Sequence, residues 1–299
     1  MAIQASDYGD LLLQSRDRHL VKRHISLFGR RRMRKTVNIA RNPLPWVQRH
    51  IAAQRLRAAG PPSVRIEPDQ GYALIPRSFI KNLDPIIAKS LQAWQRHRDR
   101  IADEKQYFFK LSRHIDVAEF RECIEAALQE DVLRLAVDYL GGVPILDKLD
   151  LWWTRPWNRT EGAQNYHLDS IPDTRSIRFL IAVTEVDEDA GPLHFVSASK
   201  SAELVRKLGY LGGIIGPDLI QRELGHDAIM RATSEVGAGI AFDASRCFHM
   251  GSRDMKKDRL MLSFTFCSWY VNEAFRDHSK WLPSTSGLTQ LQRLVLNIR

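Results

Sequence analysis

Three side chains able to share one metal ion lie in the second half of the chain. His167 and Asp169 are separated by one residue, and His249 follows at the end of a stretch that begins at Phe242. Side chains alternate along a strand, so an extended run would turn His167 and Asp169 to the same face. Two imidazoles and a carboxylate form the facial triad that binds non-haem Fe(II) and leaves three adjacent coordination positions open. These residues therefore predict an iron site.

A fourth residue extends the pattern. Arg259 stands ten residues after His249 and begins the apolar run Leu260 to Phe266. A 2-oxo acid can chelate Fe(II) through its carboxylate and ketone oxygens, with dioxygen taking the last open position. A guanidinium fork pairs with a carboxylate through two hydrogen bonds, so Arg259 suits the distal carboxylate of such a co-substrate.

Other interpretations of the same residues stay open at this point. A His-x-Asp pair occurs by chance in chains of this size, and a lone histidine on a partly apolar strand is more often a core residue. The alternative to an iron site is therefore a structural histidine pair on a β-sandwich.

The elements around these residues indicate a β-rich domain preceded by helices. Helices are expected over 84–100, over 116–140 with an Asp116/Glu119 capping box, and over 288–298 at the end of the chain. Strands are expected over 71–76, 148–154, 163–169, 176–186, 192–196, 236–242, 247–250 and 259–270. The glycine-rich stretch 201–234 between them is predicted to be an inserted lid loop.

These motifs resemble the phytanoyl-CoA dioxygenase-like branch of the Fe(II)/2-oxoglutarate-dependent oxygenases over roughly 66–272. The similar segments are Gly71 to Ile75, Tyr139 to Gly141, Tyr166 to Asp169, Ile181 to Glu185, Ala190 to Leu193, Phe242 to His249, and Arg259. The resemblance implies a double-stranded β-helix (jelly-roll) core, mainly β with flanking helices and a helical N-terminal region. It also implies Fe(II), with 2-oxoglutarate and O2 as co-substrates, and Arg259 as the 2-oxoglutarate arginine.

Two details refine the comparison with that family. The chain reads Ser197-Ala198-Ser199-Lys200 where the family often has Pro-Gly-Ser-His, so the geometry of that loop is expected to differ. Halogenating relatives replace the ligand carboxylate with Gly or Ala. The presence of Asp169 therefore favours hydroxylation of a small molecule over halogenation.

Several further side chains are candidates for the same site. Thr154, Trp153 and Asn165 are candidate 2-oxoglutarate contacts on strands leading to the site, and Ser252 and Ser263 are candidate hydroxyls near its distal carboxylate. Core packing is the alternative role for the strand residues. Arg253 is a competitor for the role of Arg259, but it lies in the turn Gly251 to Asp254 and is expected to face solvent. His194 is a candidate substrate contact, with a core position as the alternative. Trp152, Trp153 and Trp157 form an aromatic cluster near the expected mouth of the site.

Charge is concentrated at the N-terminus. The net charge is +9, and residues 1–65 carry 14 Lys and Arg against three Asp. This segment is predicted to be a basic, mainly helical extension before an oxygenase domain over 66–299, with one helix beginning after Pro45. A helix that packs on the domain and an arm that contacts an anionic partner are both compatible with this composition. No nucleic-acid motif accompanies the charge, so the helix that packs on the domain is favoured. Peripheral membrane contact of the arm and an anionic or lipid-linked substrate stay open.

The remaining composition describes an ordinary globular chain. The N-terminus lacks the apolar core of a signal peptide, and no run is long enough to span a bilayer, so a cytoplasmic location is expected. Cys123, Cys247 and Cys267 are predicted to be reduced, buried thiols. Two other functions stay open: a non-redox metalloenzyme of the cupin kind, and a catalytically silent β-barrel with a basic nucleic-acid- or membrane-binding arm.

Overall fold

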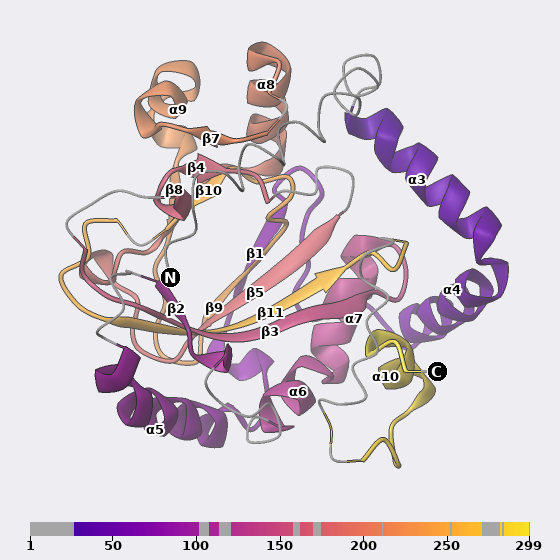
Figure 1. The fold of residues 1–299 in the computed structure, drawn as a ribbon. Helices are drawn as coiled ribbons and strands as arrows, with labels where there is room; N and C mark the ends of the chain where they lie inside the picture. Colours follow the sequence, from indigo (N-terminus) through magenta and orange to yellow (C-terminus); the bar gives the residue numbers. More distant parts are fainter. Residues whose placement is uncertain are drawn as a thin grey trace, which may run out of the picture.

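The computed structural model describes residues 27–101, 108–113, 121–157, 162–169, 175–210, 212–251, 253–270, 282 and 284–298. Ser252 and the expected capping box at Asp116 and Glu119 lie outside these residues. Two antiparallel sheets form the centre of the molecule, with helices on their outer sides (Figure 1). The expectation of a mainly β core with flanking helices is confirmed.

The larger sheet has six strands. Their order is β1 (Tyr72–Ile75), β9 (Gly239–Phe242), β5 (Ser176–Ala182), β11 (Arg259–Cys267), β3 (Ile145–Thr154) and β2 (Phe108–Lys110). The smaller sheet has five short strands in the order β7 (Ile214–Ile215), β4 (Tyr166–His167), β10 (His249–Met250), β6 (Leu193–Phe195) and β8 (Met230–Ala232). All of the pairings are antiparallel.

The central strands of the larger sheet are buried on both faces, which explains their nearly continuous apolar sequences. On β5, Ile177, Phe179 and Ile181 belong to the core shared with the helices. The alternate residues Leu180 and Ala182 belong to a second core between the two sheets. This alternation sends every second side chain of β5 and β11 into the space between the sheets, where a binding site can form.

The helices pack on the outside of this core. They are α3 (Leu27–Arg41), α4 (Pro43–Ala58), α5 (Leu83–Ile101), α6 (Arg121–Ala127), α7 (Glu130–Leu140), α8 (Ala198–Leu208), α9 (Pro217–Leu224) and α10 (Gln290–Val295). Helices α5, α6 and α7 contribute to the core on the outer face of the larger sheet. Helices α8 and α9 cover the smaller sheet through a separate apolar cluster (Figure 1).

The single helix expected over 116–140 is wrong, because α6 and α7 are separate helices. Gln129 between them is extended, with φ −63° and ψ 146°. Its side-chain amide accepts a hydrogen bond from the Lys81 amide at 2.9 Å and donates to the Lys81 carbonyl at 2.8 Å. This tertiary contact fixes the break. The expected apolar face of the helix is nevertheless buried, including Ile124, Val132 and Leu135.

The segment 201–234 is more regular than the loop that the glycines predicted. It contains the end of α8, all of α9, and the strands β7 and β8, which form the two edges of the smaller sheet. Its role as a lid stays a prediction.

The N-terminal segment is joined firmly to the domain. Arg49 on α4 is buried and donates hydrogen bonds to the carbonyls of Val143, Pro144 and Leu294, at 3.1, 3.1 and 2.7 Å. Ala53 and Leu56 on the same helix belong to the main core. No helix in the described part of the chain is long and apolar enough to cross a membrane.

Candidate metal centre

The three predicted ligands come together at one point between the sheets. His167 on β4 and His249 on β10 are direct partners across the antiparallel ladder, and their ring centroids are 4.3 Å apart. Asp169 follows β4, and its Oδ1 is 3.7 Å from the Nε2 atom of each histidine. The three ligand atoms all lie within 4.8 Å of one another, which is close enough for one ion to reach all three.

Backbone carbonyls orient both imidazoles. The Nδ1 atom of His167 lies 2.9 Å from the Asn165 carbonyl, and that of His249 lies 3.0 Å from the Cys247 carbonyl. A carbonyl only accepts, so Nδ1 carries the hydrogen in each ring and the Nε2 lone pair faces the centre of the triad. Burial lowers the pKa of His249 to about 4, which keeps this ring in the neutral form that binds metal.

The Nε2 atom of His249 is the clearest sign that the site takes an ion. It is fully buried, and within the described residues it has no hydrogen-bond partner. A buried polar atom without a partner is costly unless a ligand satisfies it. The second nitrogen of the same ring is already satisfied, so the unsatisfied atom is the one that points at Asp169.

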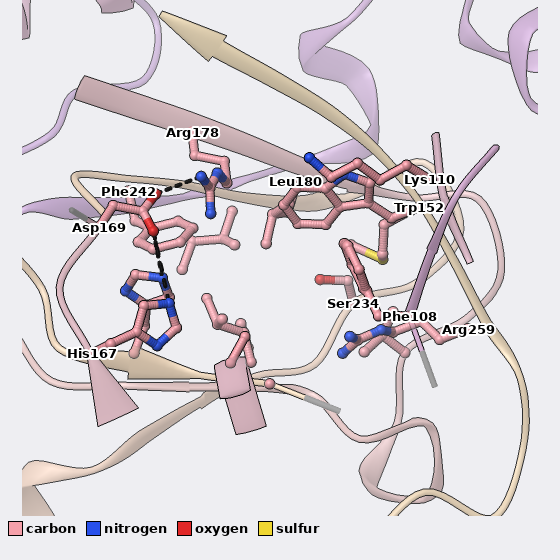
Figure 2. A pocket seen from close by; sticks show the side chains of 18 residues that line it. Phe108, Lys110, Trp152, His167, Asp169, Arg178, Leu180, Ser234, Phe242 and Arg259 are labelled. Carbon is pink, nitrogen blue, oxygen red and sulfur yellow. Dashed lines mark hydrogen bonds and ion pairs between the residues drawn. The ribbon is translucent and has the colours of Figure 1, made fainter. Parts of the chain in front are cut away.

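Arg178 on β5 holds the carboxylate ligand. Its Nη2 lies 2.5 Å from Oδ2 of Asp169, so the other oxygen, Oδ1, is left facing the two histidines (Figure 2). Burial is the largest single influence on the Asp169 carboxyl and opposes its ionisation, but the Arg178 guanidinium and the other nearby basic groups together hold its pKa below the ordinary value. The guanidinium also lies 5.2 Å from the centre of the Trp152 ring. Arg178 thus presents Asp169 as an ionised ligand whose Oδ1 faces the two histidines.

The loop that follows β9 positions two of the ligands. Its Ala244 carbonyl accepts from the Asp169 amide at 2.9 Å, and its Cys247 carbonyl binds His249. Asp243 at the start of the loop is fully buried. It accepts hydrogen bonds from the Tyr139 hydroxyl at 2.9 Å, the Ser245 hydroxyl at 2.6 Å and the Ser245 amide at 3.1 Å. This carboxylate does not reach the metal centre, but it fixes the loop that does.

The triad opens into a cavity of about 240 Å³ between the sheets. Its wall is mostly apolar and aromatic, and includes Leu180, Phe242 and Met261. Arg259 lines the same cavity and lies on the opposite side from His167 and Asp169 (Figure 2). The Arg259 side chain is almost completely buried and donates to the Gly191 carbonyl. Burial lowers its pKa to about 10, so it remains a cation at neutral pH.

Two other predicted site residues, Asn165 and Thr154, lie beside the site but do not line the cavity. The backbone carbonyl of Asn165 binds His167, and its side chain accepts from Arg253 at 3.4 Å. Thr154 is buried beside Arg259 and its hydroxyl is 3.4 Å from the Arg259 carbonyl, but it does not line the cavity. These positions do not test direct contact with a co-substrate, which stays a prediction.

Other candidates lie away from the cavity. Trp153 packs in the core beside the stacked ring of Phe109, on the face of β3 opposite to Trp152. Ser263 is buried on β11 and does not line the cavity. His194 follows Leu193 on β6; Leu193 lines the cavity, so the side chain of His194 lies on the other face of the strand. Arg253 is half-buried, so it faces solvent with only part of its side chain. Its contact with Asn165 explains this position.

Sequence reasoning missed several residues of the cavity. Arg178 was not predicted, although it is the one charged residue in the apolar run Ile177 to Ala182. Lys110, Phe108 and Ser234 also line the cavity and come from segments without a recognisable motif. Trp152 was predicted near the mouth, and it lies in the wall.

Comparison with known proteins adds a limited result. No family model and no curated protein matches the chain. Among solved structures, the non-heme alpha ketoglutarate dependent epimerase SnoN from nogalamycin biosynthesis is 17% identical, with 73% of this chain and 83% of that chain covered and a TM-score of 0.45. HygX from Streptomyces hygroscopicus, with nickel and 2-oxoglutarate bound, is 13% identical over 73% and 89%, with a TM-score of 0.44. EctD from S. alaskensis, in its apoform, is 14% identical over 67% and 74%, with a TM-score of 0.44.

Similarity at this level leaves the functional assignment to the geometry of the site. The resemblance to the phytanoyl-CoA dioxygenase-like branch likewise stays a prediction.

Proposed function

We propose that this protein is a non-haem Fe(II)- and 2-oxoglutarate-dependent dioxygenase that hydroxylates a C–H bond of a small molecule. One observation carries the proposal: His167, Asp169 and His249 converge in a cavity whose opposite wall holds the buried cation Arg259. Each turnover would consume the substrate, O2 and 2-oxoglutarate, and would release the hydroxylated product, succinate and CO2.

The donor set fits Fe(II). Two neutral imidazoles and one carboxylate occupy a single side of the ion and leave the cavity side open to exogenous ligands. The Nε2 atom of His249, unsatisfied within the described residues, and the Oδ1 atom of Asp169 point to the same place. When bound here, Fe(II) would supply the activation of dioxygen that couples to decarboxylation of the co-substrate.

The chain's own residues provide the rest of the arrangement. Arg259 would pair with the distal carboxylate of 2-oxoglutarate, whose other end would lie toward the triad. Arg259 lies on the opposite side of the cavity from Asp169 and His167 (Figure 2), an arrangement that favours a ligand that binds at both ends. The apolar walls at Leu180, Phe242 and Met261 would exclude water from the reacting groups.

The strand order supports the double-stranded β-helix that the resemblance implies. Strands β3, β5, β9 and β11 belong to the larger sheet, while β4, β6, β8 and β10 belong to the smaller one. Successive strands therefore pass mostly from one sheet to the other. We propose that these eight strands are the jelly-roll core, with the metal centre between its two sheets.

Arg259 also separates this function from a non-redox metalloenzyme. A hydrolase or isomerase needs only the metal and its water, whereas a guanidinium that lines the same cavity offers the two-hydrogen-bond partner that a co-substrate carboxylate requires. The carboxylate ligand Asp169 further supports hydroxylation, because it fills the position that a halide would need.

The decisive experiment is an anaerobic titration of the protein with Fe(II) and 2-oxoglutarate, followed by absorbance of the metal-to-ligand charge-transfer band. We expect the band in the native protein and its loss in His167→Ala and Asp169→Ala. In a second assay, after O2 is added, we expect both variants to form no succinate. Arg259→Ala should mainly raise the KM for 2-oxoglutarate, whereas Arg222→Ala on the exposed side of α9 should change neither property. Undiminished succinate formation without His167 or Asp169 would refute the assignment.

The reaction itself is tested separately with ¹⁸O2. A hydroxylase places one labelled oxygen atom in the product and the other in succinate. A turned-over substrate without label would refute hydroxylation while leaving the cofactor assignment intact.

A further inference from the structure

The outer face of the N-terminal helices is unusually apolar for an exposed surface. Eight large hydrophobic side chains are exposed in the described part of the chain, and five of them lie on α3 and α4. They are Met33, Val37, Leu44, Val47 and Ile51, with exposed fractions of 53, 41, 73, 41 and 46%. We call these five residues the α3–α4 outer face. Single exposed apolar residues are normal, but five of them on two consecutive helices favour an interaction site.

The spacing of these residues places them along one side of each helix. Met33 and Val37 are four residues apart, and Leu44, Val47 and Ile51 are spaced by three and four. The opposite side of α4 is the one that packs on the domain, through Arg49, Ala53 and Leu56. Helix α4 is therefore apolar on two sides, and the domain uses only one of them.

The same helices are strongly basic. Residues 27–58 contain nine Lys and Arg and neither Asp nor Glu. Of these cations, Lys35, Arg41 and Arg55 are exposed. In an α-helix Arg55 follows Ile51 by four residues and lies beside the apolar stripe. The outer face thus combines exposed apolar side chains with positive charge.

The two helices are held in place and do not hang free. Arg49 binds three carbonyls of the domain, and the side chain of Asn38 on α3 donates to the Tyr270 carbonyl. Both helices lie at the edge of the molecule, and α4 runs beside α7 and α10 (Figure 1). The outer face is therefore presented to solvent as a fixed surface.

We propose that the α3–α4 outer face docks on the surface of a lipid bilayer that contains anionic lipids. Apolar side chains of an interfacial helix enter the boundary between headgroups and acyl chains, while Lys and Arg bind the anionic headgroups. A nucleic acid would use the cations and leave the five apolar residues in water. A second copy of this chain would bring nine more cations against the first nine. This inference is independent of the proposed enzymatic function.

The test is flotation of the full-length protein with phosphatidylcholine vesicles, with and without phosphatidylserine, at low and high salt. Binding should require phosphatidylserine and should weaken with salt, because headgroup contacts are screened. Each of Arg41→Glu and Arg55→Glu should weaken binding by about fivefold or more. Leu44→Ser combined with Ile51→Ser should weaken it by about tenfold or more, because both apolar insertions are lost.

Matched controls separate docking from folding. Ile214→Ser removes an equally exposed apolar side chain elsewhere, and Arg222→Glu reverses an exposed charge on α9; neither should change binding. A DNA duplex serves as the competing partner. Loss of duplex binding in the charge variants, together with vesicle binding that is unchanged in the double serine variant, would overturn the proposal in favour of a nucleic acid. Absence of flotation with anionic vesicles at low salt would overturn it outright.

Discussion

Removing the charge of Asp243 should both destabilise the fold and loosen the metal centre, although this carboxylate lies outside the cavity. Asp243 is fully buried and accepts three hydrogen bonds, from the hydroxyl of Tyr139 and from the hydroxyl and amide of Ser245. The Arg175 guanidinium lies 3.8 Å from the same carboxylate. In Asp243→Asn the shape is kept, but one oxygen becomes an NH2 group. If the remaining oxygen keeps the two Ser245 bonds, the NH2 group cannot accept from the Tyr139 hydroxyl, and the charge that strengthens all three bonds is lost.

The size of the effect follows from these contacts. A hydrogen bond to a charged group contributes about 1.5–3 kcal/mol, and the nearby cation loses its partner as well. We expect Asp243→Asn to lower the free energy of unfolding by about 3 kcal/mol. In a chain of this size this corresponds to a fall in Tm of about 6 °C.

The effect on the metal is a separate expectation. Ala244 and Cys247 follow Asp243 in the same loop and hold Asp169 and His249 through their carbonyls. Loss of the partners that orient metal ligands typically costs about 10–100-fold in affinity, so Fe(II) binding should weaken by about tenfold here. Urea unfolding gives the first quantity, and anaerobic Fe(II) titration of the folded variant gives the second.

The matched control is Asp138→Asn. Asp138 is a carboxylate of the same helix region as Tyr139, but it pairs with Arg65, whose side chain is 64% exposed. Exposed pairs contribute about 0–1 kcal/mol, so this variant should keep both properties. If Asp243→Asn lost stability while its Fe(II) affinity stayed at the native value, the loop would not position the ligands and the reasoning would be refuted.

Three further predictions concern a glycine in the larger sheet, the attachment of α4 to the domain, and the cysteine thiols. A Cβ at Gly239 would lie 1.9 Å from the Leu180 carbonyl oxygen, so Gly239→Ala should cost about 3 kcal/mol or more in urea unfolding. Gly142→Ala, with nothing within 4 Å, should be nearly neutral, and equal stabilities would contradict the sheet register. Arg49→Ala leaves three carbonyls without their donor and should cost about 3 kcal/mol, unlike Arg55→Ala on the exposed side. Burial raises the pKa of all three thiols, so a thiol reagent at pH 8 should label none in the native protein and all three in denaturant; rapid native labelling would show an open core.

The convergence of the three candidate ligands was predictable because each depends on local geometry or on a recognisable motif. His167 and Asp169 share a side at period-two spacing, and the sheet then pairs His167 with His249. The same holds for the central strands, whose apolar runs mark burial on both faces. Arg259 was predictable because it opens such a run.

The features that were missed depend on contacts between distant segments. Arg178 becomes a partner of Asp169 only because β5 of the larger sheet passes beside the end of β4 of the smaller one. The break between α6 and α7 depends on the amide of Gln129 binding Lys81, and helical periodicity carries no information about that contact. Sequence spacing specifies which side chains share a face, but it does not specify which faces meet.

The metal centre depends more on buried polar groups than on its own strands. Strands β4 and β10 have only two residues each, so their ladder contributes few hydrogen bonds. The Ser201 hydroxyl on α8 adds hydrogen bonds next to these strands. It accepts from the Phe248 amide at 2.9 Å and donates to the Val196 carbonyl at 3.2 Å. Asp243 fixes the preceding loop, and Arg178 fixes the carboxylate. Short strands leave the ligands close to loops and to the open cavity, where a substrate can reach them, and the buried polar contacts give these strands the rigidity that a longer ladder would otherwise supply.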